Sequence, residues 1–519
     1  MKSYVFRVAL AIGVIVFAFV GWRTYTTRAV CPRCNVILIV VDALRASSLP
    51  CYGYAPATAP SLCRFADETV RFEQAYANSS WTLPSVMSLY TSLYPSSHNV
   101  HMSLTDILDE SIETMPQLFS RHGYATYFVA STQLNLSRTQ GFGRGFSSVR
   151  YTDPTLTRDA LSAWLDTIDA VGRSNQNGSP AFAYLHTNAV RDYSELLASP
   201  PEIFPLHPEY RTPDIPGIHA FTQATRQHAI RQLSEKLDDA TLADETYYHY
   251  KTIHDGLVLA AGGREAETAF RHLTPPVQRR MIFRSAVEDF ARTYPLEYES
   301  LVRVLYDESV RRTDAAIAQV LKRLSDNHLL NNSIVVITAD HGELLGEHGL
   351  FGHATDMFEP EIRVPLVMSV PGYNGRVIDT PAQLLDIFPT VSDLTGVHTR
   401  SYMAGVSLFP YISKQASDPN RAIISEWLRH KSIITNHWHL IETQSTKGVS
   451  HSLYSRDDNK DNPEKPQTGK GAQQTINSLS RVLGDTLDNQ PVYSPQSRPF
   501  YADPDDDFVR RLRSEGYLL

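Results

Sequence analysis

The chain has 519 residues, of which 42% are hydrophobic and 20% are charged, so it can bury a large core. This composition excludes a disordered tail protein, and 26 glycines with 31 prolines exclude collagen-like and low-complexity chains. A formal net charge of −8, dispersed and without a long basic block, argues against a surface that binds nucleic acid.

The N-terminus has the order of an export signal. Basic residues precede an uncharged run over residues 8–22, and more basic residues follow it. This order predicts a signal peptide or a retained signal anchor, and the poor cleavage site at 27–29 favours the anchor. A buried helix of the fold is the alternative. We therefore expect residues 1–34 to be an anchor or signal peptide plus a linker, with the rest of the chain outside the cytoplasm, membrane-anchored or secreted.

All four cysteines, Cys31, Cys34, Cys51 and Cys63, lie early in the chain. The first two have the spacing of a redox or zinc pair, but no second such pair exists to complete a zinc site. A structural disulfide outside the cytoplasm is the better interpretation. The sequence leaves open which cysteines pair.

Five continuous apolar runs are typical of strands that are buried on both faces of a sheet. They cover residues 35–41, 125–130, 181–185, 333–337 and 364–370. Helical patterns lie between them, over residues 112–122, 155–171 and 301–324. Strands that alternate with helices predict an α/β fold, in which a mainly parallel sheet is sandwiched by helices.

Two regions depart from this alternation. Residues 194–295 are rich in His, Arg, Tyr and Glu and contain proline-rich breaks, which indicate a helical insertion that covers or flanks the site. A separate folded module is the alternative. Residues 411–519 form a smaller α+β portion, with strands expected over 421–427 and 433–441 and a loop over 464–474. The catalytic domain is therefore expected to span residues 35–410.

Polar residues follow two of the predicted buried strands. Asp42 comes directly after the first strand, and Asp340 and His341 come shortly after the apolar run that begins at residue 333. Because ligands of open α/β sheets bind outside the carboxyl ends of the strands, we expect these side chains to converge. Two carboxylates and one imidazole suit Zn²⁺ or Mn²⁺ better than Ca²⁺, which prefers oxygen ligands alone.

Thr82 begins a helical pattern in a third segment. Backbone N–H groups and the helix dipole favour an anion at such a position. A hydroxyl there that also touches a metal loses its proton more easily and becomes a nucleophile. Each residue has an ordinary alternative, since Thr82 or Asp42 could simply cap a helix and the Asp340 segment could be a turn. Only their combination indicates an active site.

Together and in this order, the three segments resemble the sulfatase family within the alkaline phosphatase superfamily. The likeness continues in blocks at residues 40–54, 81–95, 141–146, 340–349, 363–366, 386–390, 453–454 and 512–517. It covers residues 35–190 and 300–519 and leaves the insertion unmatched. The resemblance implies a fold of the alkaline phosphatase and sulfatase type. It also implies one divalent metal ion, with Thr82 as ligand and nucleophile and with three further ligands, Asp42, Asp340 and His341. The mixed set of oxygen and nitrogen donors favours Zn²⁺ or Mn²⁺ over Ca²⁺ or Mg²⁺ for this ion.

The chain departs from the family pattern at the nucleophile. The family carries a formylglycine-forming Cys or Ser in a C/S-x-P-x-R motif, where this chain has Thr82 and, in place of the arginine, Val86. A formylglycine hydrate releases sulfate by collapse of a hemiacetal, which a threonine with its single hydroxyl cannot do. A phosphorylated threonine can instead be attacked at phosphorus by water or an alcohol. The chemistry therefore favours phosphate or phosphonate esters.

Two further departures concern the metal and the substrate. Ala43 stands where true sulfatases present another metal-binding Asp, and His341 stands where Asn is usual. Both point to the transition-metal phosphodiesterase, phosphonate-hydrolase and phosphoethanolamine-transferase branches. The family pattern H-x-x-D-x-H keeps only its first residue, His186, and Arg191 replaces its last. We predict that Arg191 and Arg45 bind the anionic group of the substrate.

The sequence thus predicts an extracytoplasmic, metal-dependent ester hydrolase or transferase. Thr82 attacks phosphorus in line, and His353 or His186 protonates the departing alcohol. Glu343 and Glu347 are expected to orient the loop around the metal. The predicted partners are a small-molecule, lipid or cell-envelope ester and, through the N-terminal segment, a membrane, but no nucleic acid. Two alternatives stay open: a sulfatase that works without formylglycine, and a catalytically inactive binding protein.

Overall fold

The fold is that of a computed structural model of the chain. The structure describes residues 29–101, 106–131, 136, 140–152, 157–191, 295–457, 466–494 and 496–497. The predicted N-terminal anchor, the predicted insertion up to residue 294 and the family block at 512–517 lie outside these ranges. Within the described ranges, no helix combines the length and the apolar character that crossing a membrane requires.

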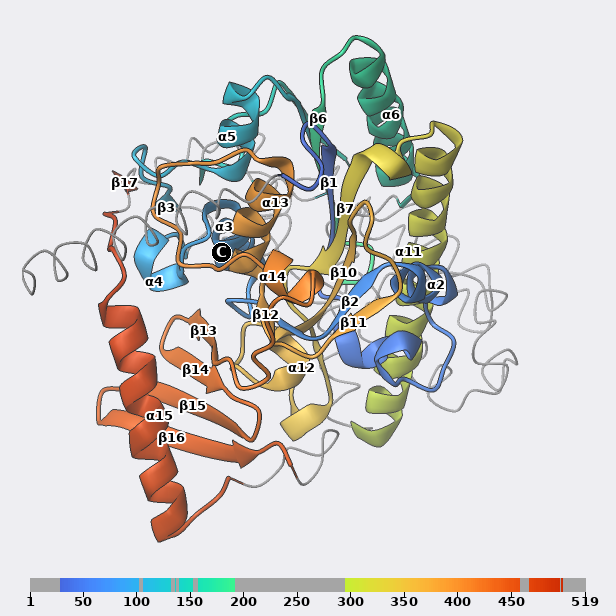
Figure 1. The fold of residues 1–519 in the computed structure, drawn as a ribbon. Helices are drawn as coiled ribbons and strands as arrows, with labels where there is room; N and C mark the ends of the chain where they lie inside the picture. The colour runs from blue at the N-terminus through green and yellow to red at the C-terminus, as the bar shows by residue number, and fades with distance from the viewer. Residues whose placement is uncertain are drawn as a thin grey trace, which may run out of the picture.

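A nine-stranded sheet forms the centre of the described fold (Figure 1). Its strands run in the order β11-β2-β10-β7-β1-β6-β4-β5, and β12 pairs with β2. Strands β7, β1, β6, β4 and β5 are parallel, whereas β10 is antiparallel to both of its neighbours. The prediction of an α/β fold with a mainly parallel sheet is confirmed. The strand bounds are β1 (Asn35–Val41), β2 (Val70–Tyr76), β4 (Ala125–Ala130), β5 (Ser148–Tyr151), β6 (Ala181–Thr187), β7 (Ser333–Ala339), β10 (Arg363–Ser369), β11 (Arg376–Ile378) and β12 (Ala382–Gln383).

The predicted apolar runs are the core strands of this sheet. Every residue of β1, β6 and β7 is buried, because these strands lie in the middle of the sheet and are covered on both faces. The sequence did not indicate β2, in which polar positions are only partly buried.

Helices cover both faces of the sheet (Figure 1). Helices α2, α6 and α11 lie on one side, and α3, α5 and α13 lie on the other. The predicted helices over 155–171 and 301–324 correspond to α6 and α11, and the one over 112–122 is the shorter α5. The helix bounds are α2 (Pro60–Glu68), α3 (Thr82–Thr91), α4 (Pro95–His98), α5 (Met115–Arg121), α6 (Thr157–Gln176), α11 (Pro295–Asp326), α12 (Glu359–Ile362), α13 (Ile387–Thr395), α14 (Phe409–Ile412) and α15 (Lys470–Asp488).

A second, antiparallel sheet follows near the C-terminus, and α15 packs on it (Figure 1). Its strands are β13 (Ile423–Trp427), β14 (His430–Ile434), β15 (Trp438–Ser445) and β16 (Gly448–Ser455). Two expectations were wrong here. The single strand predicted over 433–441 is two strands, because a turn at 435–437 reverses the chain. The loop predicted over 464–474 ends at α15, whose apolar residues at helical spacing, Ile476, Leu479, Leu483 and Leu487, are buried.

Two short pairs complete the described strands. β8 (Leu344–Leu345) pairs with β9 (Phe351–Gly352), and β3 (Asp106–Ile107) pairs with β17 (Gln496–Ser497). The β8–β9 pair closes the loop that follows β7. It brings together Glu343 and His353, which flank the two short strands and lie 2.7 Å apart.

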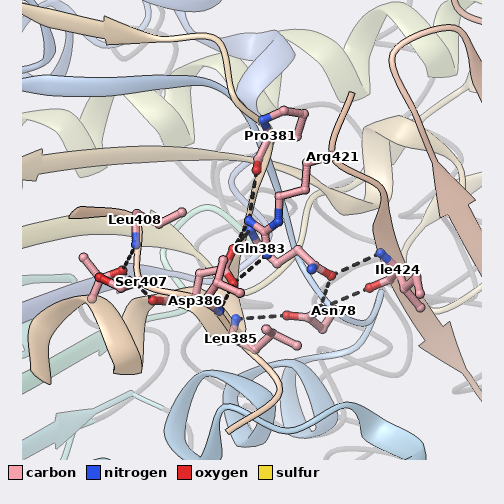
Figure 2. Close-up of polar contacts among 12 residues, drawn as sticks. Asn78, Pro381, Gln383, Leu385, Asp386, Ser407, Leu408, Arg421 and Ile424 are labelled. Atoms are coloured by element: carbon pink, nitrogen blue, oxygen red, sulfur yellow. Dashed lines mark hydrogen bonds and ion pairs between the residues drawn. The ribbon is translucent and has the colours of Figure 1, made fainter. Parts of the chain in front are cut away.

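A buried polar network joins the two sheets (Figure 2). Arg421 donates to both carboxylate oxygens of Asp386, at 2.6 and 2.8 Å. Asn78, which follows β2, donates to Gln383 at 3.0 Å and to the carbonyl of Ile424 in β13 at 3.1 Å. The second sheet is therefore attached to the first by directional hydrogen bonds as well as by apolar packing.

The cysteines form two disulfides, Cys31–Cys34 and Cys51–Cys63. The first disulfide lies within the segment just before β1, and the second links the segment between β1 and α2 to α2 itself. The sequence predicted structural disulfides rather than a zinc site and left the pairing open, and the fold has these two pairs.

Candidate active site

The register of the central strands brings two carboxylates together. Val41 at the end of β1 is paired with Ala339 of β7 on one side and with Thr187 of β6 on the other. Asp42 and Asp340 are therefore the next residues in register, at the carboxyl edge of the sheet. The N–H of Asp42 donates to the carbonyl of Thr187 at 2.9 Å, which extends the ladder by one residue.

The acidic pair and His341 form one compact cluster. One ligand atom from each of Asp42, Asp340 and His341 lies within 4.8 Å of the other two. Nε2 of His341 is 3.4 Å from Oδ1 of Asp42 and 3.7 Å from Oδ2 of Asp340. All three side chains are fully buried. The predicted convergence of these residues is thus present in the fold.

Thr82 completes the cluster from a different element. It is the first residue of α3 and is fully buried, and its Oγ1 lies 3.1 Å from Nε2 of His341. Trp81, rather than Thr82, occupies the N-cap position. The hydroxyl therefore points at the acidic cluster instead of capping its own helix, whose N-terminal dipole favours negative charge at the same place.

The unsatisfied atoms of the cluster fit a cation. Both carboxylate oxygens of Asp42 and Oδ2 of Asp340 are buried and accept no hydrogen bond from any described residue. Such groups are strongly destabilised unless a positive charge or a donor is present. Three carboxylate oxygens, one imidazole nitrogen and one hydroxyl match the donor set of Zn²⁺ or Mn²⁺.

The charges of the acidic pair support the same interpretation. Burial, and next the negative charge of Asp340, raises the pKa of Asp42. Burial also acts to raise the pKa of Asp340, but His341, His186 and the N–H of Ala43 outweigh it and hold this pKa below its usual range. A cation between the two carboxylates would favour the charged form of both.

A second group of possible ligands, His341, Glu343 and His353, overlaps the first. Nδ1 of His341 lies 2.8 Å from the carbonyl oxygen of Gly342, to which it can only donate. Nε2 is therefore the one nitrogen of His341 that can bind a cation. Since both groups need that nitrogen, they cannot bind two cations at once, and the group with the unsatisfied carboxylates is the better site.

Glu343 and His353 instead form a hydrogen-bonded pair. Oε2 of Glu343 lies 2.7 Å from Nδ1 of His353, and the His353 ring lies 4.4 Å from that of His341. Burial raises the pKa of Glu343 to about 7. Burial, and next His341, lowers the pKa of His353 well below its usual range. The raised pKa of Glu343 and the lowered pKa of His353 favour a proton on the carboxyl group of Glu343 rather than a charged His353. The His353 ring lies between this carboxyl group and His341.

His186, the other predicted acid, lies on β6 beside the same carboxylates. Its Nε2 is 3.7 Å from Oδ2 of Asp340. Neither ring nitrogen forms a hydrogen bond with another described residue, although the side chain is fully buried. His186 therefore remains available to the cation or to a substrate oxygen.

The two predicted substrate-binding arginines differ in their surroundings. A guanidinium nitrogen of Arg191 lies 3.6 Å from Oδ2 of Asp42, and the group lies over the ring of Trp81 at 5.9 Å. Arg45 turns away, because it donates to the carbonyl of Glu343 at 3.2 Å and to Glu347 at 2.8 Å. Arg191 is thus placed to reach an anion at the cluster, whereas Arg45 orients the loop that Glu343 and Glu347 belong to.

Trp427 is a residue of the site region that the sequence did not single out. It comes from β13 of the second sheet, and its ring stacks on Trp81 with 5.7 Å between centroids. Its Nε1–H donates to the carbonyl of Ala354 at 3.0 Å, directly after His353. Only its position at the end of a predicted strand was visible, and nothing in the sequence linked it to Thr82.

Comparisons with known proteins agree with this architecture. The family model described as Sulfatase matches residues 34–397, and the model described as N-sulphoglucosamine sulphohydrolase, C-terminal, matches residues 346–481. Iduronate 2-sulfatase of Mus musculus is 27% identical over 412 residues, which cover 74% of this chain and 69% of that protein. Human arylsulfatase K is 22% identical over 440 residues, which cover 81% and 76%.

Two solved structures show the same fold. A protein in complex with its substrate D-glucosamine-2-N,6-O-disulfate aligns with 88% of this chain and 99% of its own, at 19% identity and a TM-score of 0.61. The phosphonate monoester hydrolase of Agrobacterium radiobacter aligns with 87% and 95%, at 17% identity and a TM-score of 0.56.

Proposed function

This chain belongs to the sulfatase family, and from that premise we propose that it is a metal-dependent hydrolase that cleaves phosphate or phosphonate esters through Thr82. The observation that carries the proposal is the buried hydroxyl of Thr82, which lies 3.1 Å from Nε2 of His341 in a cluster with three carboxylate oxygens of Asp42 and Asp340 that accept no hydrogen bond from any described residue. Bound by Asp42, Thr82, Asp340 and His341, Zn²⁺ or Mn²⁺ would lower the pKa of the hydroxyl and neutralise charge on the ester.

The remaining steps use the chain's own side chains. Oγ1 of Thr82 attacks phosphorus, and the bond from phosphorus to the departing alcohol breaks in line. Arg191 binds a non-bridging oxygen, and the Glu343–His353 pair gives its proton to the alcohol oxygen. The proton of the Thr82 hydroxyl is released to solvent in this first step. Water then attacks phosphorus and gives a proton back to the Glu343–His353 pair, the bond from phosphorus to Oγ1 breaks, and Oγ1 takes up a proton from solvent, which restores the hydroxyl of Thr82. An acceptor alcohol in place of water would make the same reaction a transfer.

A sulfuric ester hydrolase is the second candidate. It is favoured by the names of the relatives, which include iduronate 2-sulfatase. Against it stands the chemistry of Thr82, because a sulfated threonine has no second hydroxyl through which sulfate can be expelled.

The disulfides also bear on the compartment in which the protein is located. The two disulfides support a location outside the cytoplasm. We propose that residues 1–34 are a signal anchor or a signal peptide plus a linker, and that the ester is a small molecule or a component of a lipid or cell envelope.

Paired turnover assays test the proposed function. Wild-type protein loaded with Zn²⁺ or Mn²⁺ is given a nitrophenyl phosphodiester and a nitrophenyl sulfate. We expect faster turnover of the phosphodiester than of the sulfate. The rate of phosphodiester turnover should fall by at least ~10³-fold in Thr82→Ala. It should not fall in the control Thr91→Ala, which removes a hydroxyl from the other end of α3. Preferred turnover of the sulfate, or full activity in Thr82→Ala, would refute the proposal.

A further inference from the structure

The turn that carries the first metal ligand has an unusual backbone conformation. Ala43, directly after Asp42, has a φ of 62° and is fully buried. This left-handed region is disfavoured for residues with a Cβ atom. The conformation turns the N–H of Ala43 toward Asp340, whose Oδ1 accepts it at 3.2 Å. The turn therefore connects the two carboxylates, and an interaction from elsewhere must keep it in place.

The side chain of Tyr306 supplies that interaction. Tyr306 lies on α11, is fully buried, and its hydroxyl donates to the carbonyl of Ala43 at 2.6 Å. The same hydroxyl accepts the N–H of Arg45 at 2.9 Å. One oxygen atom thus bridges the two sides of the turn, and satisfies a buried carbonyl and a buried N–H that have no partner in the strand ladder.

We propose that Tyr306 is a positioning residue for the metal site: its hydroxyl holds the Asp42–Ala43 turn in the left-handed conformation that aims Asp42 and Asp340 at one cation. The inference rests on the proposed metal-dependent function. The two hydrogen bonds of the Tyr306 hydroxyl go to the backbone of Ala43 and of Arg45, so it acts on the site through the backbone of the turn.

A second contact from α11 reaches the other half of the site. Arg303, one turn before Tyr306, pairs with Glu347 at 3.3 Å, and Glu347 also binds Arg45 at 2.8 Å. Glu347 belongs to the loop that follows His341. The helix therefore fixes the loops after both strands that supply ligands, one through Tyr306 and the other through Arg303.

The test measures metal affinity rather than turnover. Full-length wild type, Tyr306→Phe and Tyr54→Phe are titrated with Zn²⁺ and with Mn²⁺ against a chelator of known affinity. Tyr54 is the matched control, because its hydroxyl bonds Asp307 on the same helix at 2.9 Å and does not touch the turn. We expect Tyr306→Phe to weaken binding by ~10- to 100-fold, as other groups that orient metal ligands do, and Tyr54→Phe to change it by less than about threefold.

A rescue experiment separates positioning from a general structural effect. Glycine adopts the left-handed conformation without penalty, so Ala43→Gly is expected to restore ~5-fold or more of the lost affinity in the Tyr306→Phe background. In the wild-type background the same change is expected to alter affinity by less than about twofold, because the turn is already held. Urea unfolding of each metal-free variant reports whether the fold is retained.

The outcomes distinguish this inference from the proposed function. Wild type that binds neither metal would overturn the metal-dependent function and with it the role of Tyr306. Wild type that binds a metal, with Tyr306→Phe binding equally well, would overturn the role of Tyr306 alone. Affinity lost in Tyr306→Phe and unchanged by Ala43→Gly would do the same, because the turn conformation would then not be what Tyr306 controls.

Discussion

Replacing Glu361 with glutamine should make the stability of the protein less sensitive to a rise in pH from about 5 to about 8. Glu361 lies in α12 and is fully buried. Its Oε1 accepts the N–H and the hydroxyl of Thr355 at 3.1 and 3.0 Å, and its Oε2 has no hydrogen-bond partner among the described residues. Burial raises the pKa of Glu361 to about 8. Glutamine has the shape of the protonated acid and can keep both bonds to Thr355.

The direction and size of the effect on the free energy of unfolding follow from the pKa of Glu361 in the folded protein and in the unfolded chain. The folded protein holds this proton more tightly than the unfolded chain, whose glutamate has a pKa of 4.5. The stabilising effect is therefore complete below pH 4.5 and is lost as the pH rises through about 8. At ~1.4 kcal/mol for each pH unit, the loss across this window amounts to about 5 kcal/mol. The free energy of unfolding of Glu361→Gln lacks this contribution.

The assay is urea unfolding of wild type and variant at several pH values between 5 and 9, in the presence of a chelator so that metal release does not contribute. Glu68→Gln, at an exposed position in α2, serves as the charge-matched control. From pH 5 to pH 8, we expect the free energy of unfolding of wild type to fall by several kcal/mol relative to that of Glu361→Gln. Parallel curves for the two proteins would show that Glu361 is ionised in the fold and that the reasoning is wrong.

Two further predictions concern the contact between the two sheets. Arg421→Met should lower the free energy of unfolding by ~3–5 kcal/mol in urea denaturation. The reason is that Asp386 is fully buried and loses the arginine that binds both of its carboxylate oxygens (Figure 2). A loss below about 1 kcal/mol would mean that the fold does not depend on this ion pair. Trp427→Phe keeps an aromatic ring on Trp81 but removes the bond to the carbonyl of Ala354. We expect kcat to fall ~3- to 10-fold with unchanged metal affinity, and an unchanged kcat would show that Trp427 does not position the His353 loop.

The central sheet was predictable because its strands have an unambiguous signal. Branched apolar residues run without interruption over residues 36–41 of β1 and 334–337 of β7, a composition typical of strands that are covered on both faces. β2 escaped detection because Arg71, Glu73 and Gln74 interrupt its apolar residues. α15 was missed because its overall composition is polar, although its buried leucines do recur at helical spacing.

The candidate ligands were also predictable, for a geometric reason. A residue directly after a parallel core strand must lie at the carboxyl edge of the sheet, so the positions of Asp42 and Asp340 in the chain determine their proximity in the fold. Thr82 was linked to these residues only through the order of motifs along the chain, because the first residue of a helix need not lie at the carboxyl edge of the sheet. Its role as nucleophile and the metal ligation remain predictions.

Positioning residues could not be found in this way. Tyr306 and Ala43 are separated by 263 residues, and their contact depends on how α11 packs against the turn that follows β1. A tyrosine within a long helical pattern carries no sign of such a contact. Arg45 was predicted to bind the substrate, but the sequence carried no sign that its side chain donates to Glu347.

The most direct test of the account is to capture the reacting group on Thr82. Metal-loaded protein turning over bis(4-nitrophenyl) phosphate is quenched in acid, digested and analysed by mass spectrometry. We predict a 4-nitrophenyl phosphoryl group on the peptide that contains Thr82, absent after chelation of the metal and in the Asp42→Asn variant. A phosphoryl group on another residue, or the same adduct in metal-free protein, would contradict a cation held by Asp42 and Asp340 as the source of the reactivity of Thr82.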